Sequence, residues 1–240
     1  MVRRTTPSGL NTALALAALL VGSAASAQAY QCRMPRLVDA PEIRPDGPTR
    51  TPPINGYTLA ASWSPEFCKP RAGQRTHALQ CSGRNGSFGV ILHGLWPDAG
   101  RGWPQWCPTK NRPTGAEISR QLCTTPSARL VARQWAKHGS CMTKRPQTYY
   151  KVSNMLWRSI RWPDLDGLSR RRNLTAGQVR EMFLAANKGW RQDAIGLKLN
   201  ERGWLQEFRL CYDKRFRPTK CDRARYGAAD EDGLKIWRGL

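Results

Sequence analysis

The sequence predicts a single α+β domain with a central antiparallel sheet, flanking helices and disulfide bracing. Strand-like segments with period-two alternation occur early and late in the chain, and helical patterns are grouped between them. The two late strand-like segments, 195–199 and 204–212, follow each other as the strands of a hairpin do. The eight cysteines form an even set, which in an exported chain indicates four disulfides. They are Cys32, Cys68, Cys81, Cys107, Cys123, Cys141, Cys211 and Cys221.

The N-terminal 29 residues have the pattern of a secretory signal peptide. Arg3 and Arg4 precede an apolar run that is too short to span a membrane, and cleavage motifs end at Ala27 and Ala29. We therefore expect export to the periplasm or out of the cell, with no membrane-spanning segment. Residues 30–54 are proline-rich and predict an extended leader. Residues 55–240 then form the folded domain, which we expect to be a monomer.

The composition is strongly basic. Lys and Arg number 39 against 17 Asp and Glu, for a formal net charge of +22. Such a charge favours polyanionic partners, either nucleic acid or an anionic envelope surface. No Cys-x-x-Cys or His-x-x-x-His pattern is present, so we expect no metal and no other cofactor.

His93 lies at the end of a predicted strand. In the segment 87–93, Phe88, Val90 and Leu92 alternate with the residues between them. Gly94 is expected to end the strand at once, which would place His93 at the mouth of a cleft.

A second histidine, His138, lies near the end of a predicted helix that Thr125 or Ser127 would cap. Gln134, Lys137 and His138 fall on one face of this helix, whereas Val131 and Trp135 share another. Gly139 is expected to end the helix with a positive φ. The helix dipole would then favour a positively charged His138.

Two histidines on different segments suit a reaction that moves two protons, with one as general base and the other as general acid. The chain has three histidines in all. A histidine near a helix end is more often an ordinary capping residue, but two histidines in unusual settings favour chemistry. The third, His77, lies in the polar segment 69–86, which we expect to be an exposed loop.

Three segments together resemble the ribonuclease T2 family: Leu59–Cys68, His93–Asp98 and Trp135–Cys141. The resemblance covers roughly residues 55 to 221. It implies an α+β fold and a single-stranded-RNA endonuclease that needs no metal. In such an enzyme the 2′-hydroxyl of RNA attacks its own phosphate, and a 2′,3′-cyclic phosphate forms and is later hydrolysed to a 3′-phosphate. RNA would be the substrate and partner.

The resemblance also implies roles for individual residues. His138 would be the general base, His93 the general acid, and Lys137 would stabilise the transition state. Trp96 and Asp98 would form a base pocket, by ring contact and hydrogen bonding respectively. The resemblance and proximity suggest the disulfides Cys68–Cys81 and Cys211–Cys221, with Cys141 bonded to Cys107 or Cys123. It leaves the partner of Cys32 open.

Two positions depart from the family pattern, because many members have His-Glu where this chain has Arg133-Gln134. Arg133 can still contact a phosphate. Gln134 can orient a neighbour but cannot carry negative charge or transfer a proton. We therefore also weigh a weak or inactive member that acts as a cationic binding protein on nucleic acid or the cell envelope.

Two further alternatives concern residues near the motifs. A cationic cell-wall hydrolase would need two carboxylates facing each other across a cleft, and nothing pairs Glu66 with Asp98. Trp103 and Trp106 follow the first histidine segment, and each could stack on a base or simply pack in the protein.

Overall fold

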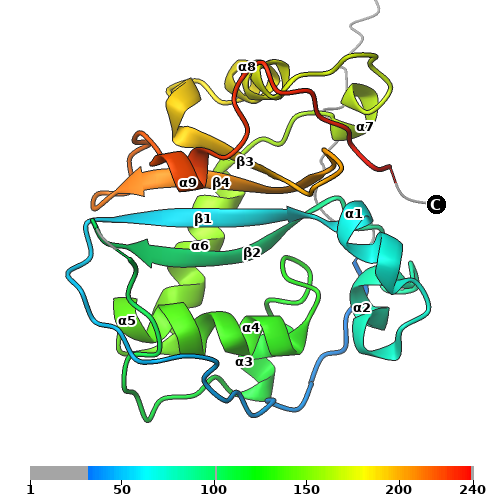
Figure 1. The fold of residues 1–240 in the computed structure, drawn as a ribbon. Helices are drawn as coiled ribbons and strands as arrows, with labels where there is room; N and C mark the ends of the chain where they lie inside the picture. Colours follow the sequence, from blue (N-terminus) through cyan, green and yellow to red (C-terminus); the bar gives the residue numbers. More distant parts are fainter. Residues whose placement is uncertain (1–31, 101, 239–240) are drawn as a thin grey trace, which may run out of the picture.

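The computed structural model describes residues 32–100 and 102–238. Its centre is a four-stranded antiparallel sheet in the order β2-β1-β4-β3 (Figure 1). The strands are β1 Gly56–Trp63, β2 Val90–Asp98, β3 Ile195–Leu199 and β4 Leu205–Asp213. The predicted α+β class and the antiparallel sheet are confirmed. The predicted signal peptide lies outside the described residues.

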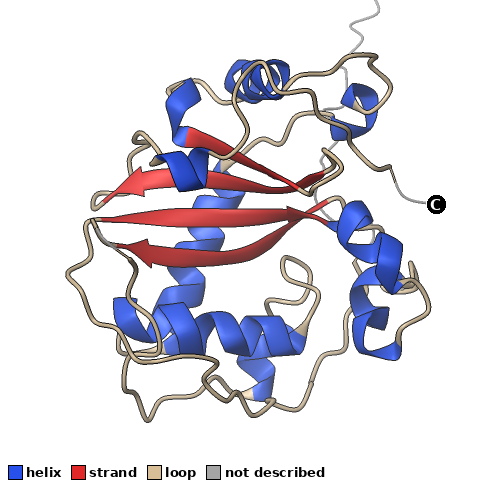
Figure 2. Cartoon of the chain, viewed as in Figure 1, coloured by secondary structure: helices blue, strands red, loops and turns tan. Residues whose placement is uncertain are grey.

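Helices flank the sheet along both of its edges (Figure 2). Helices α3, α4 and α5 lie on the side of β2, α7 and α8 lie on the side of β3, and α6 crosses behind the strands (Figure 1). None of the described helices is long and apolar enough to cross a membrane. The helical segments are α1 Ser64–Cys68, η1 Lys69–Arg71, η2 Arg75–His77, α2 Ala78–Cys81, α3 Gly115–Ser119, α4 Ala128–Gln134, η3 Trp135–Gly139, α5 Ser140–Met142, α6 Pro146–Ser159, α7 Leu165–Leu168, α8 Ala176–Ala186, η4 Gln192–Ala194 and α9 Arg223–Tyr226.

The segment expected as an exposed loop, 69–86, instead contains the short helices η1, η2 and α2. His77 is half-buried there, and its ring meets that of Phe67 edge-on at a centroid distance of 5.3 Å. The disulfide Cys68–Cys81 closes this segment on itself. The local bridge allows a compact helical turn where polarity alone suggested a loop.

The two faces of the sheet differ in character because side chains alternate along each strand. One face is apolar and buried, as with Leu59 of β1 and the paired Leu210 of β4. The other face carries polar side chains, and one row of it crosses three strands in register. Ser62 of β1 lies opposite Glu207 of β4, which lies opposite Lys198 of β3. This polar face carries the sheet's share of the candidate site.

His93 does not end its strand, contrary to expectation, but forms a β-bulge within β2. Ala60 pairs with Gly94 and Ala61 pairs with Leu92, so His93 is an extra residue with no partner across the ladder. A bulge re-aims a side chain and is common beside active sites. Here His93 lies on the polar face, and the extra residue lets both Leu92 and Leu95 face the core.

The strand continues through Gly94, which was expected to end it, and also through Pro97. A proline is tolerated because β2 is an edge strand with no ladder bond to donate on its outer side. Gly94 is needed for a close approach, since a Cβ there would lie 2.1 Å from Oε1 of Gln134. The glycine therefore lets α4 press against the strand rather than ending it.

The helix that carries His138 begins as expected and ends later. Ser127 is the N-cap and accepts from the amide of Leu130, whereas the Thr125 hydroxyl donates to the carbonyl of Leu92 at 2.7 Å. Gly139 was expected to have a positive φ, but its φ is −63°. The helix widens into the π turn η3 and continues through α5.

Gly139 has a packing role instead. A Cβ there would lie 2.7 Å from ring atoms of both Trp135 and Tyr149. The Tyr149 hydroxyl in turn donates to the carbonyl of Leu95 and accepts from its amide, at 3.1 Å each. These contacts join η3, α6 and β2, so the helix that carries His138 is held against the strand that carries His93.

Four disulfides brace the fold: Cys32–Cys123, Cys68–Cys81, Cys107–Cys141 and Cys211–Cys221. The two pairings suggested by the resemblance are present, Cys141 is bonded to Cys107, and Cys32 is bonded to Cys123. The proline-rich segment 32–54 lies against the body of the protein. The disulfide of Cys32 joins this segment to the body, and Arg50 exchanges two backbone hydrogen bonds with Gln105.

Candidate active site

A cleft of about 620 Å³ opens where the end of α4 and the π turn η3 meet the polar face of the sheet. All seven residues predicted for catalysis, phosphate contact and base contact line it. They are His93, Trp96, Asp98, Arg133, Gln134, Lys137 and His138. The sheet supplies the first three, and α4 with η3 supplies the others.

Trp96 lies between the two histidines. The centroid of its ring is 5.2 Å from that of His93 and 5.6 Å from that of His138. Its indole Nε1 donates to Oε1 of Gln134 at 2.8 Å. The tryptophan therefore lies between the two imidazoles in the cleft, and Gln134 holds the tryptophan.

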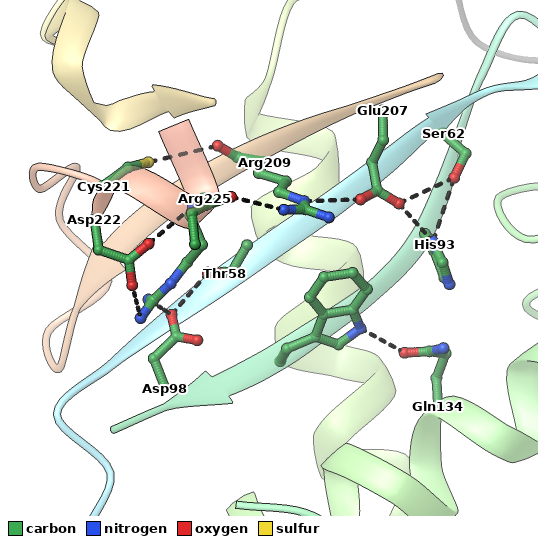
Figure 3. A network of polar contacts seen from close by, with 12 residues as sticks. Thr58, Ser62, His93, Asp98, Gln134, Glu207, Arg209, Cys221, Asp222 and Arg225 are labelled. Carbon is green, nitrogen blue, oxygen red and sulfur yellow. Dashed lines mark hydrogen bonds and ion pairs between the residues drawn. The ribbon is translucent and has the colours of Figure 1, made fainter. Parts of the chain in front are cut away.

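His93 is supported from behind by Glu207 of β4 (Figure 3). Its Nδ1 lies 2.7 Å from a carboxylate oxygen of Glu207, and the Ser62 hydroxyl lies 3.3 Å from the same nitrogen. Burial alone would raise the pKa of Glu207, but the hydrogen bond from His93 and the charges of His93 and Arg209 lower that pKa to about 2. An ionised carboxylate only accepts, so Nδ1 of His93 carries the proton and Nε2 is left for the cleft.

His138 has the opposite environment. Only 8% of it is exposed, and burial together with the positive charges of Lys137, His93 and Arg133 lowers its pKa to about 3. Its Nδ1 has no hydrogen-bond partner among the described residues. His138 is therefore neutral at neutral pH. The expected dipole-favoured imidazolium is wrong because the helix does not end here and the ring is desolvated.

Asp46 of the proline-rich segment contacts the site from the side. Its carboxylate forms ion pairs with Arg133 and Lys137, and the Lys137 distance is 3.2 Å. It also accepts from the indole Nε1 of Trp106 at 3.1 Å. The hydrogen bond from Arg133, reinforced by Lys137, lowers the pKa of Asp46 to about 2. Both cations are therefore paired with a single carboxylate from within the chain, which compensates one of their two charges.

Asp98 lies at the far end of the cleft in a second charged group (Figure 3). Its Oδ2 accepts from the Thr58 hydroxyl at 2.7 Å and is ion-paired with Arg225. Arg225 also pairs with Asp222 at 2.7 Å. Burial raises the pKa of Asp98, although Arg225 and Thr58 both act in the opposite direction.

Comparisons with known proteins give the family. A model of the ribonuclease T2 family matches residues 55–169, which include both histidine segments. A probable ribonuclease of Haemophilus influenzae is 28% identical over 189 residues, and a ribonuclease of Aeromonas hydrophila is 35% identical over 100 residues. Residues 55–169 of this chain belong to the ribonuclease T2 family.

The relatives and the chain overlap only in part. The matches cover 70% and 42% of this chain, and they span 61% and 43% of the Haemophilus and Aeromonas proteins. Among solved structures, trichomaglin, described as a novel S-like ribonuclease, superimposes with a TM-score of 0.59 at 22% identity. That match covers 76% of this chain and 98% of trichomaglin. At this identity the likeness shows that the two proteins share a fold.

Several residues of this site could not be found from the sequence. Glu207, Arg209 and Arg225 come from the last third of the chain, and Asp46 comes from the leader. A polar residue alternating with buried ones in a strand signals only an outward face. No local pattern links Glu207 to His93, which is 114 residues away.

The sequence left the roles of Trp103 and Trp106 undecided, and the two side chains differ in position. Trp103 is 44% exposed and lines the cleft, and the guanidinium of Arg50 lies 4.2 Å from its ring centroid. Trp106 is buried, and Arg133 and Lys137 lie 5.5 and 5.6 Å from its ring centroid. Trp103 is available to a ligand, whereas Trp106 packs beneath the cations. In the part of the chain that is described, no group of three His, Cys, Asp or Glu residues could hold a metal ion.

The Asp46 ion pairs predict a gain in substrate affinity when they are removed. Asp46→Asn is expected to lower the KM for RNA about threefold at low salt, because Arg133 and Lys137 would no longer be shared with a carboxylate. Asp39→Asn, an exposed leader carboxylate, is the matched control. Steady-state kinetics at two salt concentrations measure the effect, and a higher KM would mean that Asp46 holds the cations in place rather than competing.

The departure at Gln134 gives a second prediction for this T2 family site. Gln134→Ala is expected to lower kcat/KM about tenfold, because Trp96 Nε1 would lose its partner at a buried position. Gln134→Glu should stay within about threefold, since a carboxylate oxygen accepts the same bond. Its negative charge would favour a protonated His138, so the acid side of the pH–rate profile should move to higher pH. A Glu variant as impaired as the Ala variant would contradict this.

Proposed function

We propose that this chain is an endoribonuclease that cleaves single-stranded RNA by metal-independent transphosphorylation. The observation that carries the proposal is the pairing of two unlike histidines in one cleft: a neutral, buried His138 and a His93 backed by the carboxylate of Glu207. One is suited to take a proton and the other to give one. The family membership supports the same activity.

The proposed reaction begins at the ribose. Neutral His138 removes the proton of the 2′-hydroxyl, and the oxygen attacks the adjacent phosphorus. Nε2–H of His93, as imidazolium, donates its proton to the departing 5′-oxygen, and Glu207 compensates the imidazolium charge. The P–O5′ bond breaks as the P–O2′ bond forms, which leaves a 2′,3′-cyclic phosphate. In a second step water opens the ring to a 3′-phosphate, with the two histidines in exchanged roles.

The cations and the far end of the cleft complete the proposed site. Lys137 and Arg133 stabilise the additional negative charge on the phosphorane-like transition state, in exchange for their contact with Asp46. Trp96 contacts the base of the nucleotide that carries the 2′-hydroxyl, and Asp98 hydrogen-bonds to it. Gln134 acts on the substrate through Trp96 and is a positioning residue.

A digestion without metal tests the proposal. The disulfide-bonded protein is incubated with a short RNA in EDTA, and the products are resolved by mass. A 2′,3′-cyclic phosphate is expected, followed by a 3′-phosphate, while an all-deoxy oligonucleotide stays intact. Intact RNA would overturn the enzyme proposal and leave the cationic binding protein, whose RNA affinity would fall steeply with salt.

We further propose that the protein is a monomer that works in the periplasm or outside the cell. The four disulfides support this location, since such bonds persist in oxidising compartments. The signal-peptide pattern in the sequence points the same way.

A further inference from the structure

A second groove begins at His93 and extends over the polar face of the sheet away from the cleft. Its volume is about 490 Å³. His93 lines both hollows, and the row of Ser62, Glu207 and Lys198 crosses the strands beneath the second one. The groove is thus continuous with the cleft at the residue proposed as general acid.

The described cations of this groove are not paired with carboxylates, whereas the described cations of the cleft are. Within residues 32–100 and 102–238, none of its four cations forms an ion pair; they are Lys69, Arg71, Lys198 and Arg202. In the cleft, by contrast, the four described cations are each paired with a carboxylate; these are Arg133, Lys137, Arg209 and Arg225. The second groove therefore has the positive charge that a polyanion would meet.

Two acids line the groove. Glu207 is held by His93 and Arg209, whereas Glu66 accepts through Oε1 from the side-chain amide of Asn200 at 2.8 Å and its Oε2 has no hydrogen-bond partner among the described residues. Two carboxylates thus face four cations, and one of those carboxylates is compensated. The excess charge of the groove is positive.

Two of the cations are held in place by aromatic rings. Nζ of Lys69 lies 3.8 Å from the ring centroid of Trp237 and 4.7 Å from that of Trp204. The guanidinium of Arg71 lies 4.1 Å from the ring centroid of Phe67 and donates to the Phe67 carbonyl at 2.8 Å. Cation–π contacts of this kind restrict long side chains before a ligand arrives.

We propose that this groove binds the sugar-phosphate backbone of RNA on the 3′ side of the scissile phosphate. The proposal rests on the proposed function. His93 donates its proton to the 5′-oxygen of the departing nucleotide, so the departing strand must lie beside His93. The base on the other side of the scissile bond occupies the cleft at Trp96, which leaves the second groove for the departing strand. Its phosphates then pair with the four unpaired cations.

The test uses oligodeoxynucleotides that contain a single ribonucleotide, because cleavage can then occur at one place only. One substrate has one deoxynucleotide 3′ of the ribonucleotide, a second has four there, and a third has the added nucleotides on the 5′ side. The test variant is Lys198→Ala/Arg202→Ala. Its matched control is Lys151→Ala/Arg158→Ala, which removes two exposed cations of α6.

The ratio of kcat/KM for the 3′-extended substrate to that for the short substrate is expected to fall about five- to tenfold in the test variant. The corresponding 5′ ratio should fall no more than in the control. Equal losses of the 3′ and 5′ ratios, or a 3′ ratio like that of the control, would overturn the proposal.

A binding measurement separates this proposal from the proposed function. Fluorescence anisotropy of an all-deoxy oligonucleotide needs no turnover, and the slope of log K against log salt should become shallower by about 1.4 in the test variant, for two lost phosphate contacts on a single strand. If the protein cleaves none of the chimeric substrates, the proposed enzyme activity is refuted. If the salt slope is unchanged in the test variant, the proposed role of the groove is refuted, whether or not the protein cleaves RNA.

Discussion

His138→Ala is expected to lower kcat for RNA cleavage about a thousandfold, which is the contribution typical of a well-placed general base. The ring is the one imidazole of the cleft that is neutral and buried, so no neighbour can replace it: Gln134 does not titrate, and Lys137 is a cation. Steady-state kinetics on a single-ribonucleotide substrate measure the loss. His77→Ala, a half-buried histidine outside the cleft, is the control and should keep the parent rate.

The same substitution should change how stability depends on pH. The unfolded chain binds a proton at His138 below its ordinary pKa of 6.5, whereas the folded chain binds it only near pH 3. In that window the unfolded state holds more protons, so the parent loses about 1.4 kcal/mol of stability per pH unit as the pH falls. His138→Ala lacks this loss. Denaturant unfolding at pH 7 and pH 4 compares the two slopes, and equal slopes would contradict a buried neutral histidine.

Glu207→Gln is expected to lower kcat about thirtyfold. Glutamine can still accept the bond from Nδ1 of His93, so the ring keeps its orientation, but it cannot compensate the imidazolium charge. The proton donation proposed for His93 then lacks its compensating charge, so the loss of rate should vary with pH. Glu201→Gln, an exposed single-charge change in the β3–β4 turn, is the control.

The pH profile separates this positioning role from a structural one. A variant that only loosened the sheet would lose rate evenly across pH, and that outcome would contradict the role given to Glu207. The carboxylate should also affect stability, because its folded pKa of about 2 lies below the unfolded value of 4.5. Its contribution is present above pH 4.5 and is lost as the pH falls toward 2, and Glu207→Gln should lack that loss.

The fold could be predicted from the sequence because its signals are local. Alternation along 195–199 and 204–212 marked the two late strands. The bulge had a signal that was overlooked. Leu92 and Leu95 both face the core although they are three residues apart, which an uninterrupted strand cannot allow.

The candidate site could be predicted only where its residues lie in the two histidine segments. Their types and spacing indicated acid–base chemistry, but the charge state of His138 depends on burial, which the sequence does not reveal. Glu207 and Asp46 meet these residues through tertiary contacts across the sheet and from the leader. Contacts between segments far apart in the chain leave no periodic trace in one sequence.

The bulge at His93 affects how this chain could lose RNA cleavage and still bind nucleic acid. Because His93 has no partner in the ladder and its side chain is 31% exposed, the backbone pairing of the sheet does not depend on which residue stands there. A single substitution can therefore silence cleavage and leave an intact, strongly cationic protein with both hollows in place. A lineage could pass from nuclease to nucleic-acid-binding protein, or return, by changes at this one half-buried position.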